Sequence, residues 1–118
     1  MSDTLADLSR AVLAFRDERN WAQFHGLKHL IVSLCLEAGE ALALTQWKSD
    51  AEVEALSFDP TSREALADEC ADVLAYLLLA ADKASIDLAA ALRRKLAKNA
   101  LKYPVDKSYG RREKYSRL

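Results

Sequence analysis

The sequence predicts an all-α protein with a four-helix-bundle-like architecture. The 118 residues include only three Gly and two Pro, well below ordinary usage, which argues against an all-β fold. Hydrophobic residues make up 51% of the chain, enough for a packed core. Apolar residues recur at helical spacing in segments joined by short connections. We therefore expect one domain over residues 1–104 and a basic tail over residues 105–118 that is mobile on its own.

The first half of the chain reads as two long helices separated by an aromatic loop. The first helix is expected over residues 3–19, with Ser2 or Asp3 as its N-cap. Residues 20–26 interrupt the helical pattern and form the loop, and the second helix follows over residues 27–46. The apolar stripes of these helices comprise Leu5, Leu8, Val12 and Phe15, then Leu30, Leu34, Ala41 and Leu44.

Three further helices are expected in the second half. Two patterns have the spacing of a capping box, Ser49 with Glu52 and Thr61 with Glu64. Ser85 can cap a last helix, which stops before the next proline. The helices predicted from these signals run over residues 49–56, 61–83 and 85–103.

Composition excludes several classes of protein. The chain has 17 Lys and Arg against 18 Asp and Glu, a formal charge of −1, which is unfavourable for nucleic-acid binding. Its longest apolar stretch, residues 73–81, is far shorter than a membrane span, and no secretory signal is visible at the N-terminus. We expect a cytoplasmic protein with no nucleic-acid or membrane partner. Cys35 and Cys70 are expected to be buried, reduced thiols, with a disulfide between helices as the alternative.

Two acidic pairs interrupt the apolar stripes. Glu37 and Glu40 lie at i and i+3 in the second helix, and Glu69 and Asp72 have the same spacing in the fourth. Each pair therefore projects from one side of its helix. Glu37 and Glu69 occupy positions on the apolar stripes, although a single Glu-x-x-Glu pair is usually no more than a solvated face. Two such pairs, on helices long enough to pack antiparallel, predict four carboxylates that converge.

Converging carboxylates without neutralising cations predict a metal site. No Lys or Arg lies on either stripe, and oxygen-only ligands favour a hard ion, Mg²⁺ or else Mn²⁺. A di-iron site is a rival interpretation, but neither pair is followed by the histidine that it requires. His25 and His29 have the i, i+4 spacing of transition-metal ligands but straddle the start of the second helix, where ordinary capping or packing is the favoured explanation.

Five strings of the sequence, in this order, resemble the MazG-like all-α nucleoside triphosphate pyrophosphohydrolases, and in particular their dCTP pyrophosphatase branch. The strings are RNWAQFH (19–25), EAGE (37–40), QWK (46–48), DECADVLAY (68–76) and KLAKNALKYP (95–104). The resemblance implies Mg²⁺-dependent hydrolysis of a (deoxy)nucleoside triphosphate, dCTP or a modified pyrimidine nucleotide first, to the monophosphate and pyrophosphate. It makes Glu37, Glu40, Glu69 and Asp72 the metal-binding and catalytic residues, and leaves open which glutamate acts as general base.

The resemblance also implies a set of substrate-binding residues: Trp21, His25, Trp47, Tyr76, Lys95, Lys98, Asn99 and Lys102. The chain departs from the family pattern at Val12, where relatives that favour dCTP tend to carry a histidine, and this departure concerns base preference and not the hydrolytic chemistry. The spare apolar residues Ile31, Leu36, Leu78 and Leu79 predict a homo-oligomer, a dimer or tetramer. Trp47 would then reach the pocket of a neighbouring subunit. The alternative is a non-catalytic helical interaction module whose acids are merely exposed.

Overall fold

Helices make up all the regular secondary structure that the computed structural model describes, which covers residues 2–118. The all-α prediction is confirmed. The α-helices are α1 (Leu5–Glu18), α2 (Leu27–Ala43), α3 (Asp50–Ala55), α4 (Pro60–Lys83), α5 (Leu88–Lys102) and α6 (Val105–Ser108), with 3₁₀ turns at Ala22–Phe24 and Tyr115–Arg117. By their internal contacts the residues form two units, Met1–Ser85 and Ile86–Leu118.

Capping boxes set the starts of α1 and α3. Ser49 and Glu52 form the predicted box at α3, with bonds of 3.2 and 3.3 Å. At α1 the cap is Thr4, whose hydroxyl accepts a bond from the Asp7 N–H at 3.1 Å. The prediction of Ser2 or Asp3 was therefore wrong. Because the Asp7 carboxylate also accepts from the Thr4 N–H at 3.0 Å, this pair satisfies two free N–H groups at once.

Aspartates cap α4 and α5, where the sequence patterns predicted other residues. Asp59 accepts from the Ser62 N–H at 2.9 Å and is followed by a proline at the first helical turn, so the pattern at Thr61 lies inside α4 rather than at its start. Asp87 accepts from the Ala90 N–H at 3.1 Å and caps α5. Ser85 lies before that cap with φ of 56°, in the left-handed region that side-chain-bearing residues rarely adopt, so it is outside α5.

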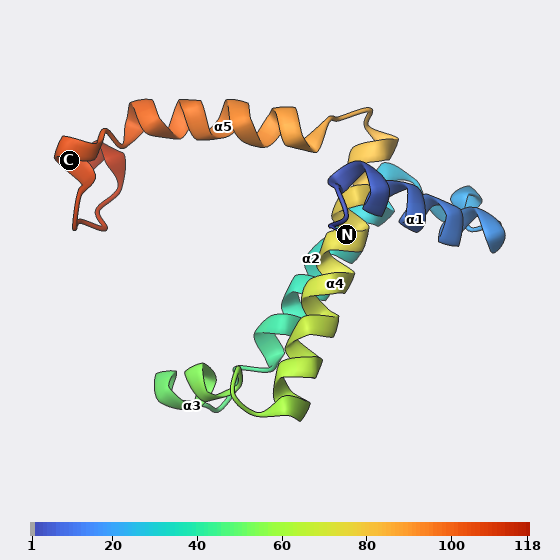
Figure 1. Ribbon diagram of the computed structural model, residues 1–118, viewed down its shortest axis with the longest axis horizontal. Coiled ribbons are helices and arrows are strands. Elements are labelled where there is room, and N and C mark those ends of the chain that lie inside the picture. The colour runs from blue at the N-terminus through green and yellow to red at the C-terminus, as the bar shows by residue number, and fades with distance from the viewer. Residues whose placement is uncertain (1) are drawn as a thin grey trace. The chain divides into compact units, whose positions relative to one another are not determined.

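The core of the first unit lies where α1 and α2 pack on α4 (Figure 1). α2 and α4 run antiparallel along their length, as predicted, and α1 crosses the C-terminal half of α4. Leu30 is 1% exposed and packs with Leu79 and Ala80, and Val12 and Leu13 of α1 close this cluster. Leu78 and Leu79 are 4% and 7% exposed and are therefore core residues, so their assignment to a spare outer face was wrong. Leu79 packs in the cluster that Leu30 of α2 forms with residues of α1 and α4.

The prediction for the two cysteines is correct for their chemical state and wrong for their burial. Cys35 and Cys70 are both free thiols, as expected, but both are exposed. Among residues 2–118, no helix has the length and apolarity needed to cross a membrane.

The second unit is α5 with a C-terminal segment folded against its end. Residues 105–118, predicted to be mobile on their own, contain α6 and the turn at Tyr115–Arg117. The ring of Tyr115 meets the ring of Tyr103 edge-on, with centroids 5.9 Å apart. This contact joins the end of the tail to the end of α5.

Candidate active site

Three of the four predicted carboxylates meet where α2 lies against α4. One oxygen each from Glu37, Glu40 and Glu69 lies within 4.8 Å of the other two. The i, i+3 spacing puts Glu37 and Glu40 on one side of α2, and the antiparallel packing brings Glu69 of α4 opposite them. Glu37 and Glu69 are half-buried and Glu40 is exposed. Asp72, one turn along α4, is exposed and is not part of this group of three.

The electrostatics of this cluster are unfavourable without a cation. Oε2 of Glu37 and Oε2 of Glu69 are each buried without a hydrogen-bond partner. Desolvation raises the pKa of Glu37 above its ordinary 4.5, and the negative charges of Glu40 and Asp72 raise it further. The pKa of Glu69 is raised in the same way, by desolvation first and then by Glu40, Glu37 and Asp72. Both residues therefore hold their protons more tightly than a solvated glutamate does.

In the part of the chain that the structure describes, no side-chain cation pairs with these acids. Within residues 2–118, no Lys, Arg or His nitrogen lies within 4.0 Å of the carboxylates of Glu37, Glu40, Glu69 or Asp72. The donors are all oxygens, and two of them are buried without a partner. This donor set fits a hard divalent cation such as Mg²⁺.

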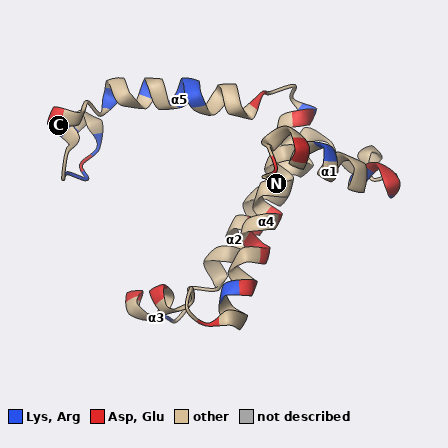
Figure 2. Ribbon diagram, viewed as in Figure 1, with Lys and Arg blue, Asp and Glu red and all other residues tan. Residues whose placement is uncertain are grey.

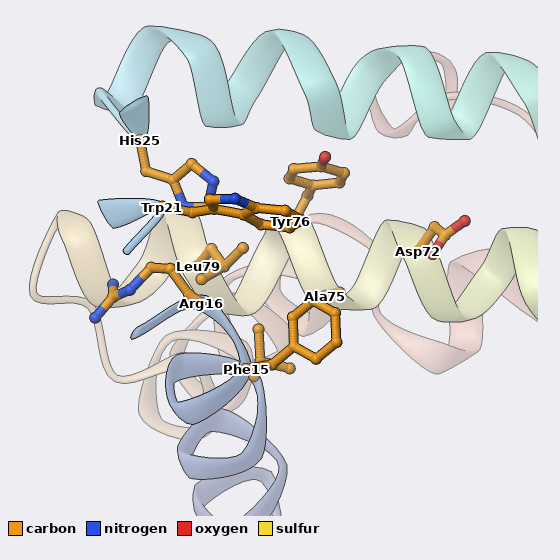
Figure 3. Close-up of a pocket in the computed structure, with 9 residues that line it drawn as sticks. Phe15, Arg16, Trp21, His25, Asp72, Ala75, Tyr76 and Leu79 are labelled. Atoms are coloured by element: carbon orange, nitrogen blue, oxygen red, sulfur yellow. The ribbon is translucent and has the colours of Figure 1, made fainter. Parts of the chain in front are cut away.

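A pocket of about 170 Å³ opens beside the cluster, between α1, α4 and the loop that leads to α2 (Figure 3). Asp72 lies at one end of its lining and Arg16 at the other. Trp21 and Tyr76 contribute aromatic rings. The remaining lining residues are Val12, Phe15, His25, Ala75 and Leu79. Asp72 therefore connects the pocket to the acidic cluster, because it lines the one and its charge acts on the other.

His25 is the pocket residue whose protonation state follows directly from its surroundings. Desolvation lowers the pKa of His25 below 6.5, and the positive charges of His29 and Arg16 lower it further. The imidazole is therefore neutral at pH 7. Its Nδ1 is buried with no partner in the chain, and the two histidine rings stack with centroids 6.0 Å apart. A ligand in the pocket can thus form a hydrogen bond with His25.

The other predicted substrate residues lie outside this pocket. Trp47, just after α2, is 92% exposed, and its φ of 65° is one that side-chain-bearing residues rarely adopt. Lys95, Lys98, Asn99 and Lys102 recur along α5, at spacings that place them on one side of that helix. They belong to the second unit.

Some pocket residues went unpredicted. Phe15 and Arg16 follow Val12 by three and four positions, so helical spacing alone could have placed all three on the pocket side of α1. No comparable signal identifies Ala75 and Leu79, which read as ordinary core positions of α4.

The chain is similar in sequence and in structure to proteins of known family. The MazG-like family model matches residues 32–118. The chain is 42% identical to dCTP pyrophosphatase 1 of Rattus norvegicus over 115 residues, which cover 98% of this chain and 68% of the rat protein. The human protein of the same name is 37% identical over the same coverage. The crystal structure of a pyrophosphatase from Archaeoglobus fulgidus is similar with a TM-score of 0.77 and 38% identity, covering 88% of this chain and 95% of that one.

Proposed function

Because the chain belongs to the MazG-like family, we propose that it is a Mg²⁺-dependent nucleoside triphosphate pyrophosphohydrolase. Its reaction is hydrolysis of a (deoxy)nucleoside triphosphate, with dCTP or a modified pyrimidine nucleotide first, to the monophosphate and pyrophosphate. Such a reaction would remove unwanted nucleotides from the pool. The observation that carries the proposal is the convergence of Glu37, Glu40 and Glu69 next to a pocket lined by aromatic rings. The names of the relatives support the substrate class.

The four acids would hold the metal ion. Glu37 and Glu69 would offer their unpartnered buried oxygens, and Glu40 and Asp72 would complete the oxygen set from the exposed side. When bound, Mg²⁺ neutralises charge on phosphoryl oxygens and makes a water molecule more acidic, and Mn²⁺ can supply the same chemistry. One of these glutamates would also act as general base toward the attacking water.

The pocket would hold the base, and α5 would bind the phosphates. Trp21 and Tyr76 present aromatic faces, and base–aromatic stacking is worth about 1–3 kcal/mol whatever the base. Preference must therefore come from polar groups, of which neutral His25 is the best placed. Val12 gives the pocket an apolar wall, which supplies no base-reading hydrogen bond. Four residues of α5 would contact the phosphates: Lys95, Lys98, Asn99 and Lys102.

The site would be completed by self-association. Ile31, Val32, Leu36 and Leu42 of α2 are between 46% and 70% exposed, which leaves an apolar face of this helix uncovered. A second copy of the chain is the partner that we propose for this face. Assembly would also give Trp47 a role, since an indole exposed in one chain could then reach the pocket of another.

The decisive experiment measures pyrophosphate release from a panel of deoxynucleoside triphosphates, with and without Mg²⁺. We expect turnover only with the metal, with pyrimidine nucleotides cleaved fastest. The products also discriminate, because monophosphate and pyrophosphate indicate attack at the α-phosphorus, whereas orthophosphate does not. If well-folded protein turned over no nucleotide, the chain would instead be a non-catalytic helical interaction module.

A further inference from the structure

The net charge of the whole chain is close to zero, but its two units carry opposite net charges. Residues 86–118 carry ten Lys and Arg against three Asp and Glu, a formal net of +7. Residues 1–85 carry seven Lys and Arg against fifteen Asp and Glu, a formal net charge of −8. Figure 2 shows the basic residues recurring along α5 and the acidic ones along α4. A nucleoside triphosphate carries about four negative charges, so the second unit is the part of the chain that attracts it.

Within the second unit, the folded tail brings two ammonium groups to one aromatic ring. Nζ of Lys102, in the last turn of α5, lies 4.9 Å from the ring centroid of Tyr115. Nζ of Lys114, from the tail, lies 5.9 Å from the same centroid. The Tyr115 ring is fixed in turn by its edge-on contact with Tyr103. The ammonium groups of Lys102 in α5 and Lys114 in the tail therefore lie beside the same aromatic ring.

The acidic residue next to Lys114 in the sequence is already paired with another side chain. Glu113 directly precedes Lys114, but its carboxylate pairs with Arg111 at 3.2 Å. In the described chain, neither Lys102 nor Lys114 has a carboxylate oxygen within 4.0 Å of its Nζ. Two uncompensated cations held at one ring repel each other, and an anion that binds both relieves that repulsion.

We propose that Lys102 and Lys114, positioned by Tyr115, form a subsite for the polyphosphate of the substrate. The inference rests on the proposed function for its ligand class, and it makes the C-terminal segment part of the binding machinery. Lys114 and Tyr115 are the new members. Lys114 contributes an ammonium group to the phosphates, and Tyr115 is a positioning residue, which contacts Tyr103 and the two lysines and acts on the phosphates only through the lysines.

The first test uses the full-length protein in EDTA at low ionic strength, with inorganic tripolyphosphate titrated by calorimetry. Without metal the acidic cluster repels this probe, so the signal reports the basic unit alone. We expect Lys114→Gln to weaken binding about 2- to 10-fold, the range from an exposed ion pair to a charge-assisted hydrogen bond. Tyr115→Phe should bind as wild type because it keeps the ring, and Tyr115→Ala should lose affinity as Lys114→Gln does.

Lys107→Gln is the matched control, because it removes one positive charge from the same tail but from a side chain that does not contact the Tyr115 ring. Equal weakening by Lys107→Gln and Lys114→Gln, or no tripolyphosphate binding by the wild type, would overturn the subsite. In turnover with dCTP and Mg²⁺, Lys114→Gln should raise KM by a similar factor and leave kcat unchanged. An unchanged KM would mean that the site binds free polyphosphate and not the substrate. Absence of all turnover would count against the proposed function, while the calorimetry would still decide the subsite.

Discussion

Glu37 and Glu69 present partly buried oxygens to each other with no protein partner, an arrangement that a folded chain retains at a cost in stability. We predict that Glu37→Gln, Glu40→Gln, Glu69→Gln and Asp72→Asn each lower kcat/KM about 10²- to 10³-fold, the usual effect of removing one group that stabilises a charged transition state. Pyrophosphate release at saturating Mg²⁺ measures this. Near-wild-type turnover in any two of the variants would refute the assignment of these acids as metal ligands.

Trp21 is the aromatic residue most directly placed to hold a base, since it lines the pocket and meets Phe15 edge-on at 6.0 Å. We predict that Trp21→Ala raises KM about 5- to 150-fold, which corresponds to the loss of about 1–3 kcal/mol of stacking. The dependence on Mg²⁺ concentration should stay unchanged, because the metal is held elsewhere.

Trp47→Ala provides the comparison for that variant. Trp47 lies outside the pocket of its own chain, so a rise in KM for Trp47→Ala would indicate that it reaches the pocket of a second copy. If neither tryptophan variant changed KM for the best substrate, the pocket would not be a stacking site.

At the scale of helices, the acidic cluster works against the pairing of α2 with α4 when metal is absent. Desolvation raises the pKa of Glu37, so between pH 4.5 and that raised pKa the folded state binds more protons than the unfolded state. The free energy of unfolding therefore falls as pH rises through this window. We predict that the free energy of unfolding of the Glu37→Gln variant decreases less over this pH window, and that this variant is more stable than wild type at pH 7 in EDTA.

Urea unfolding of both proteins across this pH range measures the difference. Glu64→Gln is the control, because it removes one exposed carboxylate of α4 that belongs to neither acidic pair. A Glu37→Gln protein that unfolds more easily than wild type at every pH would show that Glu37 contributes packing, and that its charge is not the dominant cost.

The helices themselves could be predicted with more certainty than their ends. The acids could be placed because i, i+3 spacing fixes their helix face before any tertiary contact forms. Helix starts were harder to predict, because neighbouring patterns compete. The Thr61 pattern satisfies the capping-box rule, but Asp59, two residues earlier and followed by proline, is also a favourable N-cap and begins α4. Local sequence cannot choose between two valid caps.

Local sequence patterns also could not predict which side chains of α4 are buried or which contacts the tail makes. The C-terminal half of α4 is apolar on several sides, and Leu79 is covered because α1 and α2 both pack near it. Lys114 reads as one of several basic residues until the tail folds back against Tyr103. Both outcomes depend on contacts between distant segments, which periodicity within one segment does not encode.

For the whole molecule, the first consequence is an oligomer. Besides the exposed apolar side chains of α2, α4 carries Leu74 and Leu77, which are 36% and 37% exposed. We predict a mass of two or four times 13.1 kDa by light scattering at micromolar concentration. A monomeric mass under these conditions would contradict the prediction, and would also remove the proposed route by which Trp47 reaches a pocket.

Metal binding should stabilise the molecule as a whole, because the ion would connect α2 to α4. A ligand present at 100 times its Kd contributes about 2.7 kcal/mol to the free energy of unfolding. We therefore predict that Mg²⁺ raises the melting temperature of the wild type by several degrees and that of Glu69→Gln much less. Melting curves in Mg²⁺ and in EDTA, at constant ionic strength and protein concentration, test this. Equal shifts in the two proteins would place the stabilising ion elsewhere.

The positions of the two tryptophans also make them intrinsic fluorescence probes of two different events. Trp21 precedes α2 and lines the pocket, whereas Trp47 follows α2 and is 92% exposed. A base stacked in the pocket would quench the emission of Trp21. Burial of Trp47 by a second copy would shift its emission to shorter wavelength, since indole fluorescence follows the polarity around the ring. Single-tryptophan variants would therefore separate ligand binding from assembly in two unlabelled fluorescence titrations.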